Sequence, residues 1–110
     1  MTYFPEQGDI VWISFDPSSG KEIMKRRPAY VISRKIFNEH TGLAIIAPIS
    51  STVRGIKLEV VLPEQLKTKG AVLVHQLKSL DFNEREAIFI EKVRQKEIEE
   101  IKSLAKLLIE

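Results

Sequence analysis

The residues whose types could do chemistry stand in two short stretches, one around Arg27 and one at residues 50–52. Arg27 precedes Pro28 in a basic segment that also contains Glu22, and the second stretch is Ser50-Ser51-Thr52. The planar guanidinium of an arginine can clamp two phosphate oxygens, and a hydroxyl can donate a hydrogen bond to the same oxygens. A nearby glutamate could accept a proton or orient the arginine. These residue types therefore fit chemistry at a phosphodiester.

The sequence offers little for other catalytic chemistries. It has no cysteine, its two histidines are His40 and His75, and it carries no glycine-rich phosphate loop, zinc-protease motif or nucleophile elbow. His40 lies in a predicted turn, where a surface role is expected. His75 lies in a predicted strand, where it could be an ordinary buried or edge histidine. We therefore predict neither a metal site nor a cofactor.

One reaction suits arginine, hydroxyls and a single glutamate. RNA carries its own nucleophile, the 2′-hydroxyl, so an enzyme needs only to align it, remove its proton, stabilise the phosphorane and protonate the departing 5′-oxygen. That route requires no metal. Each residue also has a plain structural alternative: Arg27 and Glu22 could form a surface ion pair, and Ser50 could satisfy a backbone group at a strand end.

The positive charge is concentrated in the middle third of the chain. Residues 21–57 contain eight lysines and arginines against two glutamates, a net charge of +6, although the whole chain carries only +2. Such a patch is typical of a surface that binds a phosphate backbone. Lys21, Lys25 and Arg26 are expected to contact phosphates without reading sequence. The alternative is a solvated face with scattered cations.

The hydrophobic pattern predicts short strands separated by turns. We expect a loop over Asp16–Arg27, with Pro28 at the first position of a strand, and a turn over Asn38–Gly42. This arrangement favours a small β-barrel or sandwich. The predicted strands are Ile10–Phe15, Ala29–Ser33, Leu43–Ile49, Ile56–Leu62, Ala71–Leu77 and Ala87–Val93.

The C-terminal segment has a helical period that begins at Gln95. Its apolar residues recur at spacings of three and four, and Arg94 stands where a capping residue would be expected. We predict a helix packed on the barrel, with a subunit interface as the alternative, and we expect Trp12 to pack in the core or at an interface. The apolar residues of this pattern are Ile98, Ile101, Leu104, Ala105 and Leu108.

Length and hydropathy predict a single domain over residues 1–110. No apolar run approaches the roughly 20 residues of a membrane span, and the first residues do not resemble a signal peptide. We therefore expect a cytoplasmic protein that does not bind a membrane.

The order and spacing of several motifs resemble the MazF/PemK toxins of bacterial type II toxin–antitoxin modules. These motifs are GDIVWISFDPSSGKE, RPAYVIS, APISS, KLEVVL and VHQLKSLD, and the match runs from about Tyr3 to the terminal helix. The resemblance implies a mainly β fold, an SH3-like β-barrel of the CcdB/PemK type with a C-terminal α-helix, which works as a homodimer. It also implies a ribosome-independent endoribonuclease, or mRNA interferase, that acts on single-stranded RNA. The implied partner is an antitoxin, similar to MazE or PemI, with a disordered acidic tail.

The resemblance assigns roles residue by residue. It implies that Arg27 is the main catalytic residue, that Ser50 contacts the scissile phosphate and that Glu22 takes part in catalysis. His75 stands where many relatives carry an acid, so it could shuttle protons or stack on a base. Residues 23–26 replace the small residues of the family loop, which should change the loop's packing and its phosphate contacts. The residues expected to contact RNA are Phe15, Ser18, Lys21, Lys25, Arg26, Ser51, Thr52, His75 and Gln76.

Two other functions remain open at this stage. A related toxin group with a similar barrel poisons DNA gyrase through a Trp-Gly-Ile-like C-terminus, whereas this chain ends Leu107-Leu108-Ile109-Glu110. A non-catalytic barrel that binds nucleic acid would keep the basic patch and lack cleavage.

Overall fold

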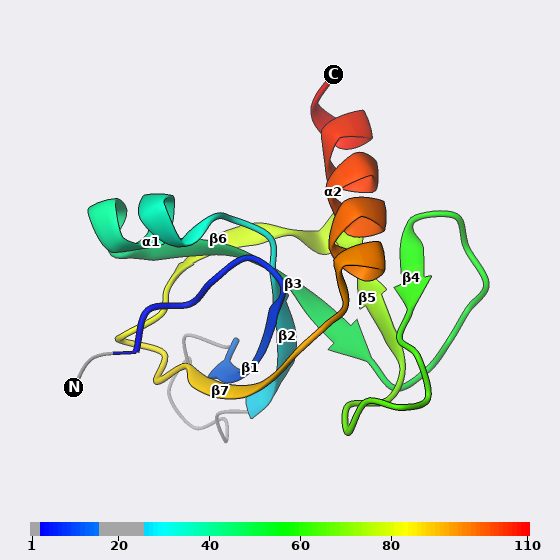
Figure 1. Ribbon diagram of the computed structural model, residues 1–110, viewed down its shortest axis with the longest axis horizontal. Coiled ribbons are helices and arrows are strands. Elements are labelled where there is room, and N and C mark those ends of the chain that lie inside the picture. Colours follow the sequence, from blue (N-terminus) through cyan, green and yellow to red (C-terminus); the bar gives the residue numbers. More distant parts are fainter. Residues whose placement is uncertain (1–2, 16–25) are drawn as a thin grey trace, which may run out of the picture.

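The computed structural model describes residues 3–15 and 26–110, and within these ranges the chain forms seven strands and two α-helices (Figure 1). Neither of these helices has the length and hydropathy needed to cross a membrane. The elements are β1 (Asp9–Ser14), β2 (Arg26–Val31), α1 (Lys35–Thr41), β3 (Leu43–Ser50), β4 (Glu59–Val61), β5 (Ala71–Leu73), the 3₁₀ turn η1 (Val74–Gln76), β6 (Lys78–Asp81), β7 (Ile88–Lys92) and α2 (Gln95–Ile109).

The strands form one antiparallel sheet in the order β4-β5-β3-β2-β1-β7, and β6 also pairs with β3. One edge of β3 serves two partners: its first half pairs with β6 and its last two residues pair with β5. The sheet therefore curls into a barrel-like form that is not closed. This confirms the predicted fold, a mainly β, barrel-like domain with a C-terminal helix.

Both faces of the central strands are buried, because neighbouring residues alternate between two clusters. Ile10 faces the cluster that α2 covers, and Val11 faces the other. In α2 the buried residues include Ile98, Ile101 and Ala105, which confirms that the helix packs on the sheet. The helix-side core contains Ile10, Tyr30, Ala47, Ile49, Val60, Leu62, Val72, Val74, Val93, Ile98, Ile101 and Ala105. The opposite core contains Val11, Ile13, Ala29, Val31, Ala44, Ile46, Leu80 and Phe82.

Helix α2 begins after Arg94 without a side-chain cap, and an ion pair stabilises its first turn instead. The Arg94 guanidinium donates from Nε and Nη2 to the two carboxylate oxygens of Glu97, at 2.9 and 2.7 Å. This hydrogen bonding is the main reason why the pKa of the buried Glu97 lies below its ordinary value. A carboxylate in the first turn also interacts favourably with the helix dipole.

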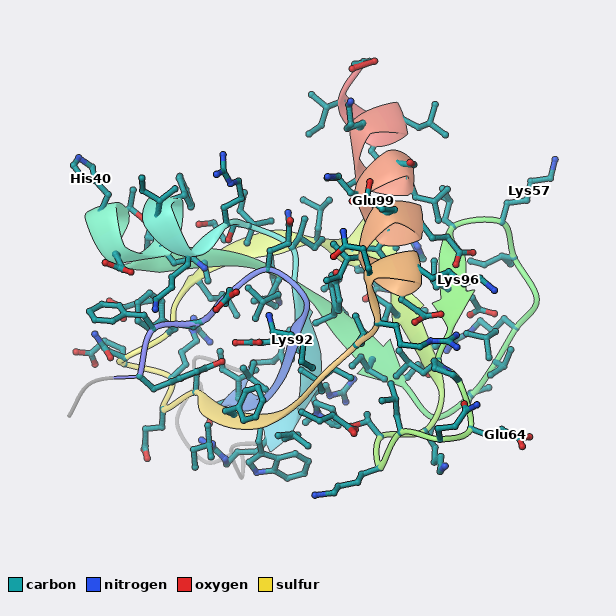
Figure 2. The ribbon with its side chains drawn as sticks, viewed as in Figure 1. His40, Lys57, Glu64, Lys92, Lys96 and Glu99 are labelled. Atoms are coloured by element: carbon teal, nitrogen blue, oxygen red, sulfur yellow. The ribbon has the colours of Figure 1, made fainter. Side chains whose placement is uncertain are left out.

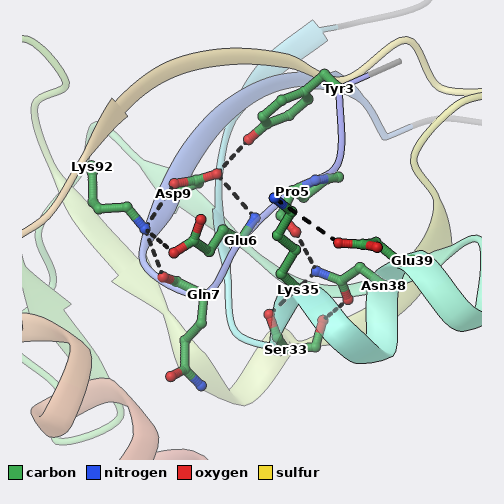
Figure 3. Close-up of polar contacts among 10 residues, drawn as sticks. All are labelled: Tyr3, Pro5, Glu6, Gln7, Asp9, Ser33, Lys35, Asn38, Glu39 and Lys92. Carbon is green, nitrogen blue, oxygen red and sulfur yellow. Dashed lines mark hydrogen bonds and ion pairs between the residues drawn. The ribbon is translucent and has the colours of Figure 1, made fainter. Parts of the chain in front are cut away.

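Residues 35–41 form helix α1, so the prediction of only a turn over Asn38–Gly42 was wrong. Gly42 ends the helix at φ 76°, and its N–H donates to the carbonyl of Asn38. The Asn38 side chain is fully buried and bonds to Ser33 and to the carbonyl of Pro5 (Figure 3). These partners from elsewhere in the chain outweigh the local turn preference of asparagine.

Three further boundaries differ from the prediction. The strand expected over Ala71–Leu77 ends at Leu73, and the next three residues form η1 instead. The following strand, β6, was not predicted. The strand expected over Ile56–Leu62 is limited to β4. The loop predicted over Asp16–Arg27 was given a C-terminal end that is too late, because β2 already begins at Arg26.

Trp12 does not lie in the core. Its side chain is 39% exposed, and it stands opposite Ile88, also exposed, in the pairing of β1 with β7. Of the two expected alternatives, core packing was wrong, and packing at an interface stays a prediction.

Candidate functional site

A cavity of about 430 Å³ lies where β2 begins and β3 ends. Arg27 from β2 and Ser50 from β3 both line it, although 23 positions separate them in the sequence. The structure thus places the two principal residues predicted from the sequence in one cleft. The residues that line the cavity include Arg26, Arg27, Pro28, Ser50, Ser51 and Lys69.

The register of β2 against β3 explains why Arg27 and Ser50 lie close together. In the antiparallel pair of β2 with β3, Ala29 is paired with Pro48. Continuing that register by two residues places Arg27 opposite Ser50, on the same face of the sheet. The Arg27 side chain is exposed, and no carboxylate of the described residues forms an ion pair with it. Its guanidinium is thus presented toward solvent at the cavity.

The Ser50 hydroxyl already has a local structural role. It accepts a hydrogen bond from the N–H of Thr52 at 3.1 Å and donates to the carbonyl of Thr52 at 3.2 Å. The second bond is long for a hydroxyl donor, and a hydroxyl rotates easily. An anion in the cavity could therefore take the Ser50 proton while the bond from the Thr52 N–H persists.

Gly70 holds the Ser50 backbone in place by close packing. Gly70 has φ +119°, and a β-carbon at this position would lie 2.0 Å from the carbonyl oxygen of Ser50. Only glycine permits this approach. The contact stands next to the pairing of Ser50 with Ala71, so β5 and the residue before it support the end of β3.

Arg26 has a structural role that the sequence did not reveal. Its guanidinium donates to the Ser14 hydroxyl and the Trp12 carbonyl, both at 3.1 Å, and to the carbonyls of Glu86 at 2.6 Å and Arg85 at 3.4 Å. These bonds tie β2 to β1 and to the turn before β7. The predicted phosphate contact of Arg26 stays a prediction, although its Nη1 and Nη2 groups already donate to acceptors within the protein.

Lys69 is a cavity residue that sequence reasoning missed. Its side chain is exposed, and its ammonium donates to the backbone carbonyl of Glu64 at 2.5 Å. The only signal in the sequence was a cation directly before a glycine at the start of a strand, which is a common arrangement.

Comparison with known proteins identifies the family. The sequence profile of the PemK-like, MazF-like toxins of type II toxin–antitoxin systems matches residues 6–109. The chain belongs to this family. It is 36% identical over 107 residues to the endoribonuclease toxin MazF of Escherichia coli (strain K12), covering 97% of this chain and 96% of that one. It is also 39% identical over 85 residues to the endoribonuclease toxin ChpB of the same strain, covering 73% and 72% of the two chains.

Solved structures of the family have the same fold. A crystal structure of MazE–MazF (form II) from Deinococcus radiodurans matches with a TM-score of 0.91 at 34% identity, covering 98% of this chain and 97% of that one. Form I of MazF from the same organism matches with a TM-score of 0.88 at the same identity, covering 98% of each chain. The open barrel described above is therefore the fold of MazF.

Several residues that were predicted from the family resemblance to contact RNA lie outside the cavity. His75 and Gln76 are exposed on η1, so the expectation that His75 lies in a strand was wrong. Phe15 packs against the opposite core, and the Lys78 ammonium lies 5.1 Å from the centre of its ring. Thr52 is exposed beside Ser50. Their RNA contacts remain predictions.

Four of the predicted MazF-like site residues lie outside the described residues. They are Ser18, Lys21, Glu22 and Lys25, and their predicted roles are unchanged. His40 lies at the exposed end of α1 and its side chain points to solvent, as expected for a surface residue (Figure 2).

A second polar cluster fixes the N-terminal segment, and it shares no residue with the cavity. The buried carboxylate of Asp9 accepts from the Tyr3 hydroxyl at 2.6 Å and pairs with the Lys92 ammonium at 3.1 Å (Figure 3). Burial, followed by the bond to Asp9, raises the pKa of Tyr3 far above its ordinary value. Lys92 also lies 3.5 Å from Glu6. Because each group is satisfied within the protein, the cluster is structural.

Proposed function

We propose that this chain is the toxin of a type II toxin–antitoxin module, which cleaves single-stranded mRNA at specific sequences and thereby inhibits translation and growth. The activity is that of an endoribonuclease, the class of its MazF and ChpB relatives. The observation that carries the proposal is the cleft that Arg27 and Ser50 share in a chain of this family. The proposed cleavage needs neither a ribosome nor a metal.

In the proposed mechanism, RNA supplies the nucleophile. The 2′-oxygen forms a bond to phosphorus as the bond to the 5′-oxygen breaks, which leaves a 2′,3′-cyclic phosphate and a 5′-hydroxyl. Arg27 clamps the non-bridging oxygens, and Ser50 donates a hydrogen bond to the same phosphate. The 2′-hydroxyl loses a proton and the leaving 5′-oxygen gains one. Glu22 accepts a proton or orients Arg27.

The proposed partners follow from the charge and from the family. RNA binds in a groove shared by two subunits of a homodimer, and the cognate antitoxin places a disordered acidic tail on the basic surface. A MazE–MazF crystal structure is among the matches, which supports an antitoxin of this kind. The exposed apolar side chains of Trp12, Ile88 and Leu107 offer surface for subunit contacts. The proposed location is the cytoplasm.

The test is cleavage of a long single-stranded RNA by the purified protein with EDTA present, followed by sequencing of the new ends. We expect 5′-hydroxyl ends and 2′,3′-cyclic phosphates at a recurring sequence motif. A requirement for added metal, or 5′-phosphate products, would contradict the mechanism. A supercoiling assay with gyrase should show no inhibition.

A further inference from the structure

We infer that Lys69 is a second phosphate-binding residue of the cleavage site, which carries an ammonium to the RNA backbone beside Arg27. This inference rests on the proposed function and adds to it a residue that the family motifs do not indicate. Lys69 belongs to the loop before β5, yet its side chain lines the same cavity as Arg27 and Ser50.

The loop that carries Lys69 is anchored on both sides of it. Gly70, the next residue, packs against the carbonyl of Ser50, and its own carbonyl accepts from the N–H of Leu62 at 2.9 Å. Thr68, the preceding residue, is buried and donates from its hydroxyl and its N–H to the Glu91 carboxylate of β7, at 2.7 and 2.8 Å. The Lys69 backbone is thus held at the cavity while its long side chain reaches solvent.

Glu91 accepts enough hydrogen bonds to remain ionised as an anchor. Burial alone would raise its pKa. The bonds from the Thr68 hydroxyl and from the N–H groups of Lys67 and Thr68 outweigh that effect and hold the pKa of Glu91 below its ordinary value. The anchor therefore persists at neutral pH, where the toxin would act.

The ammonium of Lys69 bonds to a neutral group of the protein. Within the part of the chain that the structure describes, no carboxylate forms an ion pair with its ammonium, which rests on the neutral carbonyl of Glu64. Because Nη1 and Nη2 of Arg26 are bonded within the protein, Arg27 and Lys69 are the two cations lining this cleft that have no acidic partner among the described residues and can face a ligand. A phosphodiester complements that pair.

The chemistry of lysine indicates what it binds. An ammonium is a compact, strongly hydrated point charge on a flexible stem, suited to a phosphate oxygen and unsuited to stacking on a base. Exchanging a carbonyl partner for a phosphate gains a charge-assisted bond. Arg27 acts at the scissile phosphate, and Lys69 holds the RNA backbone. Lys69 should therefore affect substrate affinity more than the rate of the chemical step.

The experiment compares Lys69→Ala with Lys67→Ala, which removes the same charge from the same loop at a side chain that does not line the cavity. Binding is measured to single-stranded 2′-O-methyl RNA of random sequence, which lacks the nucleophile and stays intact. Loss of one phosphate contact should reduce the slope of log affinity against log salt by about 0.7. Between 50 and 200 mM salt this is roughly a 2.6-fold smaller loss of affinity than in the wild type.

Lys69→Ala should show the smaller slope, and Lys67→Ala and Lys69→Arg should keep the wild-type slope. In cleavage assays we expect Lys69→Ala to raise KM several-fold with kcat nearly unchanged, and Lys69→Arg to restore KM. A wild-type slope in Lys69→Ala, an equal change in Lys67→Ala, or a fall in kcat at constant KM would overturn the inference.

The two proposals fail in distinguishable ways. If the wild-type protein leaves RNA intact with EDTA present, the proposed function fails whatever Lys69 does. If the wild type cleaves and Lys69→Ala matches it in both salt slope and KM, only the role of Lys69 fails.

Discussion

Gly70 lies so close to Ser50 that a β-carbon on Gly70 would stand 2.0 Å from the Ser50 carbonyl oxygen. The contact joins the residue before β5 to the end of β3, and therefore fixes one wall of the cleft in which Arg27 lies. A backbone contact of this kind cannot be relieved by rotating a side chain.

Gly70→Ala should therefore disturb both folding and cleavage. The alanine must displace the backbone of Ser50 and adopt an unfavourable φ, so we expect a loss of about 2–3 kcal/mol in the free energy of unfolding and a cleavage rate at least about 10-fold lower. Urea unfolding and RNA cleavage measure the two effects. Gly55→Ala is the control, since Gly55 has φ +75° with open space around it. That variant should lose only about 1 kcal/mol and cleave normally.

Arg27→Ala should abolish cleavage in a protein that remains folded. The side chain is exposed and makes no ion pair with a described residue, so its removal should change the free energy of unfolding by less than about 0.5 kcal/mol. Losing a charge that stabilises the transition state should lower kcat by about 100-fold or more. Single-turnover cleavage and urea unfolding provide the comparison. Cleavage at the wild-type rate would remove Arg27 from the catalytic role.

Arg26→Ala should show the reverse of Arg27→Ala, with lower stability and nearly normal cleavage. Four acceptors on β1 and in the turn before β7 lose their donor, and we expect the free energy of unfolding to fall by about 2 kcal/mol. Cleavage per folded molecule should stay within a few-fold of wild type. A stable Arg26→Ala protein with greatly weakened RNA binding would show that the guanidinium does contact phosphate.

Ser50→Ala should lower the cleavage rate about 10-fold or more, because the phosphate loses a hydrogen-bond donor. It also removes the acceptor of the Thr52 N–H, which should cost about 1 kcal/mol of stability. Ser50→Thr keeps the hydroxyl and should therefore retain most of the cleavage rate and most of the stability. If Ser50→Ala cleaved normally, the hydroxyl would have only its turn-forming role.

Acid should weaken the start of α2 through Glu97. Its pKa is lowered in the folded state by the Arg94 hydrogen bonds, so the pair stabilises the protein fully above the unfolded-state pKa of about 4.3. This contribution disappears as the pH falls through the lower folded-state value. Glu97→Gln should reduce the free energy of unfolding by about 1 kcal/mol at pH 7, and the difference should vanish once the pH lies below the folded-state pKa of Glu97. Glu100→Gln, an exposed change in the same helix, should show no such dependence.

Local pattern was sufficient for much of the fold. The strands near Asp9–Ser14, Leu43–Ser50 and Ile88–Lys92 and the helix from Gln95 follow from apolar periodicity, since side-chain direction repeats every two residues in a strand and every 3.6 in a helix. Arg27, Ser50 and the concentration of positive charge were likewise evident from residue type and order.

Contacts between distant segments decided the rest. Asn38 favours a turn by itself, and it is helical here because Ser33 and Pro5 satisfy its buried amide. Arg26 and Arg27 are identical in chemistry and adjacent in sequence. Both line the cleft, and only the carbonyls around Arg26 show that its guanidinium is also bonded to the scaffold. The sequence by itself determined the residue types, while the register of β2 with β3 and the packing of Gly70 on Ser50 decided where they meet, because both depend on partners that chain order does not specify.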